Sequence, residues 1–167
     1  MKAFIFAAGK GTRLKPFTDK HPKALAKVNN ITLLERNIKF LQSFGINDFI
    51  INIHHFGEQI VDFLKENNNF GAKIEISDES EELLETGGAL VFAKELLEQE
   101  EHFLIMNADI LTNLNISDFI VVTKTETTLA INFSSFQTFF KCRLRCKTQT
   151  SLIFRLNGCS TTNTENF

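Results

Sequence analysis

The feature that most constrains the fold is a short apolar segment that runs directly into a glycine-containing loop. Residues 4–8 are all apolar, and the five residues after them read Gly-Lys-Gly-Thr-Arg. An unbroken apolar run of this kind is typical of a buried parallel strand. Gly9 and Gly11 carry no side chain, so the backbone there can adopt positive φ angles and point successive N–H groups into one concavity. The sequence therefore predicts a phosphate site where this strand ends, in a glycine loop that we define as residues 9–16.

Polar and basic side chains in and after the glycine loop suit phosphate oxygens. Thr12 offers a hydroxyl donor, and Arg13 offers a planar cation that can hold two phosphate oxygens at once. Lys23 adds a mobile positive charge from beyond the loop. One hydrogen bond to a charged group contributes roughly 1.5–3 kcal/mol, so these side chains together could hold a polyphosphate. The alternative is a glycine-rich turn with scattered surface cations.

Two common nucleotide loops do not match this spacing. The Walker pattern needs four residues between its glycines, whereas only Lys10 separates Gly9 from Gly11. The dinucleotide fingerprint needs a third glycine where Leu14 stands. Both interpretations are therefore excluded.

The segment instead resembles the signature of the sugar-phosphate nucleotidyltransferases. Residues 7–16 read Ala-Ala-Gly-Lys-Gly-Thr-Arg-Leu-Lys-Pro, and residues 22–25 read Pro-Lys-Ala-Leu. The resemblance implies a glycosyltransferase-A-like nucleotidyltransferase core and catalytic roles for Arg13 and Lys23. It also implies that a nucleotide is bound by residues of the first motif, namely Ala8, Gly9, Gly11, Thr12 and Arg13.

Apolar periodicity predicts that strands and helices alternate along the chain. We expect strands at residues 2–8, 48–53, 72–77 and 102–107, and helices at residues 59–65 and 86–97. A further helix starts at a capping-box sequence, residues 32–35, and ends at Gly45. This alternation implies right-handed crossovers and a Rossmann-like three-layer α/β/α sandwich with a mainly parallel sheet. Ligands of such sheets bind outside the carboxyl ends of the strands.

Asp109 closely follows the last of these predicted strands. It should therefore face the same crevice as the glycine loop. Phosphoryl and nucleotidyl transfer usually need Mg²⁺, which prefers oxygen ligands such as carboxylates. The resemblance strengthens this interpretation, because Asn-Ala-Asp at residues 107–109 is similar to the metal-binding Gly-Asp or Val-Asp motif of the family. We predict that Asp109 binds Mg²⁺; an aspartate that caps a turn is the alternative.

A third motif, Glu-Thr-Gly-Gly at residues 85–88, stands at a predicted helix start. Paired glycines permit the close approach of a flat ligand, and a helix N-terminus favours anions. In the family a similar stretch lines the pocket for base and ribose, which makes Thr86, Gly87 and Gly88 candidate nucleotide contacts. Without a ligand, the same residues would form an ordinary helix-initiating turn.

The resemblance implies two phosphate substrates, a nucleoside triphosphate and a sugar 1-phosphate. Residues 85–88 and the Asn-Ala-Asp-Ile-Leu segment at residues 107–111 look most like the small bacterial uridylyl- and guanylyltransferases that act on N-acetylmuramate or mannose 1-phosphate. The motifs do not distinguish the base or the sugar. Two alternatives remain: a nucleotide-binding remnant without turnover, and a regulatory nucleotide-sensing subunit.

Charge and apolar run lengths argue against several other partners. The net charge is −2 and no run of like charges occurs, so we expect neither a nucleic acid nor an anionic membrane as a partner. No apolar segment approaches the ~20 residues needed to cross a bilayer, and the N-terminal run is too short for a signal peptide. We therefore expect a cytoplasmic protein, and the sequence does not indicate its oligomeric state.

The resemblance ends near Ala130 and divides the chain into a core, residues 1–131, and an atypical tail, residues 132–167. The family carries a second metal-binding aspartate further on, but no aspartate follows Asp118 here. All three cysteines lie in the tail, in a spacing that fits neither a disulfide framework nor a zinc site. We interpret the tail as a poorly ordered product of a reading-frame shift or truncation near Ile131. A divergent native C-terminus is the alternative.

Overall fold

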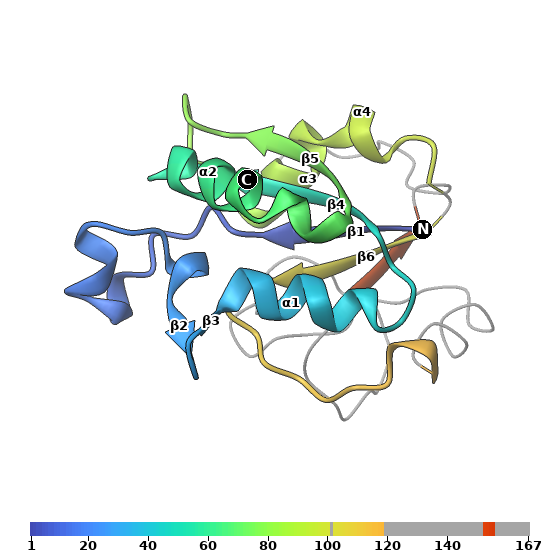
Figure 1. The fold of residues 1–167 in the computed structure, drawn as a ribbon. Coiled ribbons are helices and arrows are strands. Elements are labelled where there is room, and N and C mark those ends of the chain that lie inside the picture. Colours follow the sequence, from blue (N-terminus) through green and yellow to red (C-terminus); the bar gives the residue numbers. More distant parts are fainter. Residues whose placement is uncertain (101, 119–151, 156–167) are drawn as a thin grey trace.

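The computed structural model describes residues 1–100 and 102–118 in full and the backbone alone of residues 152–155 (Figure 1). The predicted boundary at residue 131 lies outside these residues. So does the predicted tail, residues 132–167, apart from the backbone of residues 152–155.

A central sheet carries its strands in the order β5-β4-β1-β6-β7. In its centre, β1 (Lys2–Phe6) pairs in parallel with β4 (Asp48–Ile53) on one side and with β6 (His102–Asn107) on the other. On the outer side of β4, β5 (Lys73–Asp78) continues the parallel arrangement. Strands β1, β4 and β6 are almost wholly buried in their middle residues, which explains why their sequences are continuous apolar runs.

Three further strands, β2, β3 and β7, occur in the described residues. At the edge beside β6, β7 (Leu152–Arg155) pairs antiparallel, and it was not predicted from the sequence. A short antiparallel hairpin of β2 (Lys27–Val28) and β3 (Ile31–Thr32) stands outside the sheet and leads into the first helix.

Helices α1 (Leu33–Gln42) and α2 (Gly57–Glu66) cover one face of the sheet (Figure 1). Both helices carry apolar residues at spacings of three and four, which places those residues on one side. The resulting core joins the two helices to β1, β4 and β6 through Leu34, Ile38, Leu41, Ile60, Leu64, Ile5, Ile51 and Leu104, all at most 2% exposed.

Helices α3 (Thr86–Phe92) and α4 (Lys94–Leu97) cover the opposite face. Here Ala93 and Leu97 pack against side chains that point the other way from the strands, namely Phe4, Ile50, Phe103 and Ile105. The molecule therefore has three layers, and the predicted α/β/α sandwich with a mainly parallel sheet is confirmed.

Several predicted elements have other bounds in the structure, among them α1, α2 and β5, and for two more the cause is visible. The single helix predicted over residues 86–97 is wrong, because the backbone leaves the helical region at Ala93 (φ −83°, ψ 11°) and separates α3 from α4. Ala89, Ala93 and Leu97 are all buried on the two sides of this break. The first strand ends at Phe6 rather than Ala8, since the N–H of Ala7 bonds to a side chain of β4 instead of another strand.

The start of α1 matches the predicted capping box only in part. The Thr32 hydroxyl accepts a hydrogen bond from the N–H of Glu35 (3.1 Å), as expected for an N-cap. Glu35 does not return to the backbone of Thr32. Its carboxylate instead forms an ion pair with Lys39 one turn later (2.6 Å).

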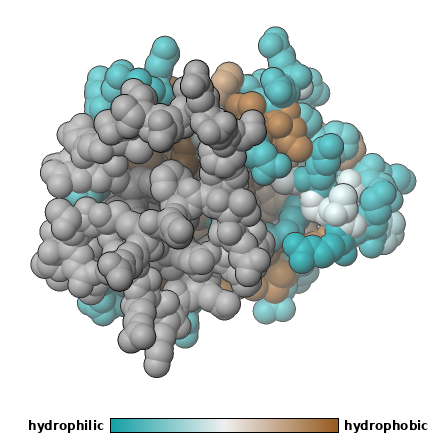
Figure 2. Space-filling view, turned by 180° about the vertical axis from the view of Figure 1, so that it is seen from behind, coloured by the Kyte–Doolittle hydropathy of each residue, from teal (hydrophilic) through white to brown (hydrophobic). Residues whose placement is uncertain are grey.

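In the coloured part of the surface in Figure 2, brown apolar residues lie among teal hydrophilic ones. Of the side chains that the structure describes, the most exposed large apolar ones are those of Val91 and Phe92 in α3, at 73% and 58%. Among the residues that the structure describes, no helix is long and apolar enough to span a membrane.

Candidate active site

A cavity of about 680 Å³ lies at the carboxyl ends of β1, β4 and β6. This is the edge at which parallel sheets bind ligands, and the volume suits a small molecule. The wall includes the end of β1 and the glycine loop, Asn52 of β4, residues 83–86 at the start of α3, and residues 107–109 at the end of β6.

Most of the residues predicted from the sequence to form the site line this one cavity. They come from chain segments far apart in sequence and comprise Ala8, Gly9, Gly11, Thr12, Arg13, Lys23, Thr86 and Asp109. Gly87 and Gly88 do not line it. They lie in the first turn of α3, where a Cβ at Gly88 would come within 3.3 Å of the Leu84 Cβ. The absence of a side chain at Gly88 thus lets α3 pack closely on the segment before it.

The two glycines of the loop differ in conformation. Gly11 has a φ of 59°, and a Cβ there would lie 2.8 Å from the Cβ of Lys23, so no other residue fits without a shift. Gly9 does not use the positive φ that a glycine permits. Within the described part of the chain, no atom outside Gly9 and its two neighbours comes within 4 Å of a Cβ built on Gly9, so these residues leave the space beside it open to a ligand.

Two hydrogen bonds to the carbonyl of Gly11 hold the glycine loop in place. This oxygen accepts from the N–H of Leu14 (2.8 Å) and from the hydroxyl of Thr18 (3.0 Å). The contacts close a short 3₁₀ turn over Thr12–Leu14, which presents Thr12 and Arg13 to the cavity. Arg13 is exposed and bonds to none of the residues that the structure describes, so its guanidinium is available to a ligand.

Lys23 and Asp109 form an ion pair across the cavity. Their side chains are 22% and 38% exposed, so the pair remains accessible to solvent. A positive group suited to phosphate thus lies against a negative group suited to a cation. Each charge compensates the other when no ligand is bound.

The donor set is compatible with Mg²⁺ that enters with a nucleotide. No group of three or more His, Cys, Asp or Glu side chains gathers in the described ranges 1–100 and 102–118. A protein that offers a single carboxylate can still bind Mg²⁺, because this ion takes most of its remaining ligands from phosphates and water. Among the described residues, Glu85 and Asp109 are the carboxylates that line the cavity, and Asp109 is the one that follows the end of β6.

Two buried asparagines, Asn37 and Asn52, form hydrogen bonds with the backbone of the cavity wall. Neither role was predicted from the sequence. The amide of Asn52 in β4 accepts from the N–H groups of Ala7 (2.7 Å) and Ala8 (3.4 Å). The amide of Asn37 in α1 donates to the carbonyl of Ala108 (2.8 Å), next to Asp109. Both asparagines are only 2% exposed. The sequence gives one sign of these roles: an amide residue stands among apolar residues, in the strand for Asn52 and on the buried helix face for Asn37.

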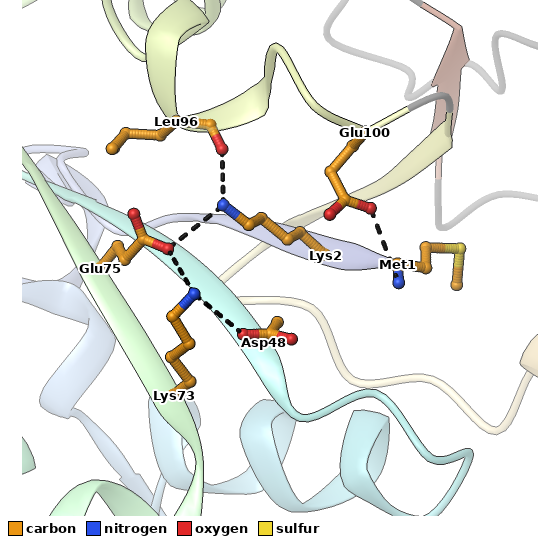
Figure 3. A network of polar contacts seen from close by, with 7 residues as sticks. All are labelled: Met1, Lys2, Asp48, Lys73, Glu75, Leu96 and Glu100. Carbon is orange, nitrogen blue, oxygen red and sulfur yellow. Dashed lines mark hydrogen bonds and ion pairs between the residues drawn. The ribbon is translucent and has the colours of Figure 1, made fainter.

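A separate network of charges lies at the opposite, amino end of the sheet (Figure 3). The ammonium of Lys2 donates to the carboxylate of Glu75 (3.2 Å) and to the carbonyl of Leu96 (2.7 Å). Lys73 pairs with Glu75 (3.3 Å) and with Asp48 (3.7 Å). These contacts join β1, β4, β5 and α4 and lie away from the cavity wall.

The charges of this network shift two pKa values. Burial alone would raise the pKa of Glu75, but its hydrogen bonds and ion pairs with Lys2 and Lys73 outweigh burial and lower it. The pKa of Lys73 is raised, chiefly by its hydrogen bond to Glu75 and then by the charges of Glu75 and Asp48.

Sequence similarity to known proteins covers most of the chain. Residues 2–135 match the family model described as Nucleotidyl transferase. The N-acetylmuramate alpha-1-phosphate uridylyltransferase of Neisseria meningitidis serogroup B is 36% identical over 135 residues, which are 81% of this chain and 57% of the relative. The choline-phosphate cytidylyltransferase of Streptococcus pneumoniae is 49% identical over 78 residues, which are 47% of this chain and 33% of the relative.

Solved structures show the same fold. The crystal structure of HddC from Yersinia pseudotuberculosis complexed with GMP-PN superimposes with a TM-score of 0.66 at 27% identity. The match covers 73% of this chain and 53% of HddC. The chain thus spans between a third and somewhat more than half of the length of these relatives.

Proposed function

Because the chain belongs to the nucleotidyl transferase family, we propose that it transfers a nucleoside monophosphate from a nucleoside triphosphate to a sugar 1-phosphate and releases pyrophosphate. The observation that carries this proposal is the convergence of Arg13, Lys23 and Asp109 on one cavity at the carboxyl edge of the sheet. The solved relative HddC in complex with GMP-PN supports a nucleotide as the ligand.

The proposed reaction is an in-line displacement at the α-phosphorus. An oxygen of the sugar 1-phosphate forms a bond to that phosphorus, and the bond to the pyrophosphate oxygen breaks. No general base is needed, because the attacking phosphate oxygen is already ionised. Arg13 and Lys23 stabilise the negative charge that moves onto the leaving pyrophosphate.

The glycine loop positions the triphosphate for this displacement. Gly9 leaves open space for the close approach of phosphates, while Gly11 fixes the turn that presents Thr12 and Arg13. Thr86, which lines the cavity at the start of α3, would contact the ribose or base. Ala8 carries the backbone into the loop.

Asp109 would hold Mg²⁺ in this proposal. The ion would neutralise part of the phosphate charge when it is bound. Lys23 then exchanges its contact with Asp109 for a contact with a phosphate oxygen, so the apo ion pair separates when the nucleotide enters.

A second candidate acceptor is phosphocholine. One relative, 49% identical over 78 residues, is a choline-phosphate cytidylyltransferase. That match covers less than half of this chain, whereas the uridylyltransferase match covers 81%. We therefore favour a sugar 1-phosphate acceptor and include phosphocholine in the test.

The test is Mg²⁺-dependent release of pyrophosphate by the purified chain. The assay combines ATP, CTP, GTP, UTP and dTTP with mannose, glucose, N-acetylglucosamine and N-acetylmuramate 1-phosphates and with phosphocholine. Release with one pair identifies donor and acceptor, and Asp109→Asn should abolish most of it. A folded chain that binds a triphosphate but releases nothing with any acceptor contradicts turnover and favours the nucleotide-binding remnant.

A further inference from the structure

Asn52 occupies a position in the sheet where an apolar residue would be expected. It lies in β4 in register with Phe6 of β1 and with Ser77 of β5. Its neighbours in the strand are apolar, and its own side chain is 2% exposed. A buried amide costs free energy unless its donor and acceptor groups are bonded, so its contacts define what it does.

The amide oxygen of Asn52 continues the hydrogen bonding of β1 beyond the end of the strand. Ladder pairing with β4 stops at Phe6, and the N–H groups of Ala7 and Ala8 bond to Asn52 Oδ1 instead (2.7 and 3.4 Å). These are the last two residues before the glycine loop. Asn52 therefore determines the direction in which the backbone leaves the sheet and enters that loop.

Glu79 holds the other end of the same amide. Asn52 Nδ2 donates to Glu79 Oε1 (2.8 Å), and Glu79 is itself only 2% exposed. The N–H of Glu79 donates to the carbonyl of Ile53 (2.9 Å), which fixes Glu79 to the end of β4. Its second oxygen, Oε2, is buried and has no hydrogen-bond partner among the residues that the structure describes.

The carboxylate of Glu79 selects one of the two orientations of the Asn52 amide. A carboxyl oxygen that carries no proton can only accept a hydrogen bond, so Glu79 Oε1 faces the amide nitrogen of Asn52. The amide oxygen then faces Ala7 and Ala8. The reversed amide would place N–H groups against N–H groups at Ala7 and oxygen against oxygen at Glu79, which would leave buried donors and acceptors unpaired.

We propose that Asn52 and Glu79 are positioning residues that set the backbone of the glycine loop for nucleotide binding, Glu79 acting through the amide of Asn52. This inference rests on the proposed function, since it assigns both residues to the same nucleotide site. Asn52 lines the cavity, but the contacts it makes are with the loop backbone and with Glu79. Neither side chain needs to touch the reacting atoms.

The chain offers graded substitutions that separate this role from general packing. Asn52→Ala removes all three hydrogen bonds of the amide. Glu79→Leu keeps a similar volume but leaves Asn52 Nδ2 without its acceptor, whereas Glu79→Gln retains an oxygen that can accept from it. Ser77→Ala is the matched control. Ser77 is 3% exposed, lies beside Asn52 in the sheet, and its hydroxyl has no hydrogen-bond partner within the described part of the chain.

The experiment measures binding of each nucleoside triphosphate with Mg²⁺ by isothermal titration calorimetry, after circular dichroism has shown that each variant is folded. Loss of a buried hydrogen bond should weaken triphosphate binding by about tenfold or more in Asn52→Ala and several-fold in Glu79→Leu. Glu79→Gln should recover binding to within about threefold of wild type, and Ser77→Ala should remain within about twofold. The KM for the acceptor should change far less than the KM for the triphosphate.

The outcomes distinguish this inference from the proposed function. If the wild-type chain binds triphosphate and folded Asn52→Ala and Glu79→Leu bind it equally well, the positioning role is wrong and the proposed function stands. If Asn52→Ala does not fold, the comparison of Glu79→Leu with Glu79→Gln decides. Equal weakening in these two Glu79 variants also contradicts the role of the carboxylate. A wild-type chain that binds no triphosphate contradicts the proposed function, and this inference fails with it.

Discussion

Arg13 differs from Lys15 and Lys23 because it has no partner among the residues that the structure describes. Lys23 pairs with Asp109, and Lys15 pairs with Asp19 (3.0 Å). If Arg13 meets the charge that develops on the phosphates, Arg13→Ala should lower kcat by at least about 100-fold with little change in stability. Steady-state pyrophosphate release provides the measurement. Lys15→Ala is the control and should keep the wild-type rate, and an unchanged rate in Arg13→Ala would remove its catalytic role.

Gly9 and Gly11 should respond differently to the same substitution. Gly11→Ala forces a Cβ into the left-handed region and against Lys23, so it should lower the free energy of unfolding by at least about 1–2 kcal/mol. The added methyl group of Gly9→Ala meets no neighbour in the described residues, so the stability of this variant should stay within about 0.5 kcal/mol of wild type.

The loss expected from Gly9→Ala is instead in ligand binding, because the added methyl group occupies the open space beside the loop. Urea denaturation and triphosphate titration of both variants test this contrast. Stable Gly11→Ala, or wild-type triphosphate affinity in Gly9→Ala, would contradict the respective role.

That the candidate side chains meet in one cavity could be predicted from the sequence, but the residues that hold the cavity wall could not. Thr12, Arg13 and Asp109 stand beside strand ends, and the rule that parallel strands present their carboxyl ends at one edge was enough to bring them together. The contact between Asn52 and Glu79 joins residues 27 positions apart, and that between Asn52 and Ala7 spans 45. No local pattern encodes such pairs. Only the strand order and register bring them within hydrogen-bond distance.

The first turn of α1 provides a test of a local sequence signal. The hydroxyl of Thr32 satisfies the N–H of Glu35. Thr32→Ala leaves that donor without its cap and should lower the free energy of unfolding by about 1 kcal/mol. Urea denaturation measures the change, and Thr32→Ser should restore most of it because the hydroxyl is retained. Equal stability of Thr32→Ala and wild type would show that packing of the helix outweighs the cap.

Strands were easier to predict than helix boundaries for a physical reason. β4 and β6 have the predicted bounds, because strands buried on both faces read as apolar runs that polar residues end. Where α3 gives way to α4, the sequence has neither glycine nor proline, and Ala93 continues the apolar spacing of a helix. β7 is defined by its pairing with β6 and lies far from it in sequence.

Charged groups that pair with each other lie at the amino ends of the strands, and polar groups that line the cavity lie at the carboxyl ends. The amino ends of β1, β4 and β5 carry Lys2, Asp48, Lys73 and Glu75, which compensate each other (Figure 3). The carboxyl ends border the cavity, where the charges are arranged for a ligand. Because the two ends are linked only through the packed interior, a change at the amino end should alter stability without altering the site.

Glu75→Gln tests this separation through pH. The lowered pKa of Glu75 means that its ionised form is favoured in the folded chain, so its contribution to stability is present above the ordinary pKa of 4.5. That contribution is lost as pH falls through the lower pKa of the folded state. Wild type should therefore lose unfolding free energy more steeply in acid than Glu75→Gln, while near neutral pH the variant should be the less stable of the two.

Urea denaturation from pH 7 to pH 3 measures both differences, and triphosphate titration at pH 7 measures the site. Glu95→Gln is the control, since Glu95 is exposed and has no ion pair with a described residue. It should leave the pH dependence as in wild type. Parallel pH profiles for wild type and Glu75→Gln would show that the network does not stabilise the fold. Weakened triphosphate binding in Glu75→Gln would show instead that the two ends of the sheet are coupled, because the substitution lies at the end away from the cavity and can reach it only through the strands.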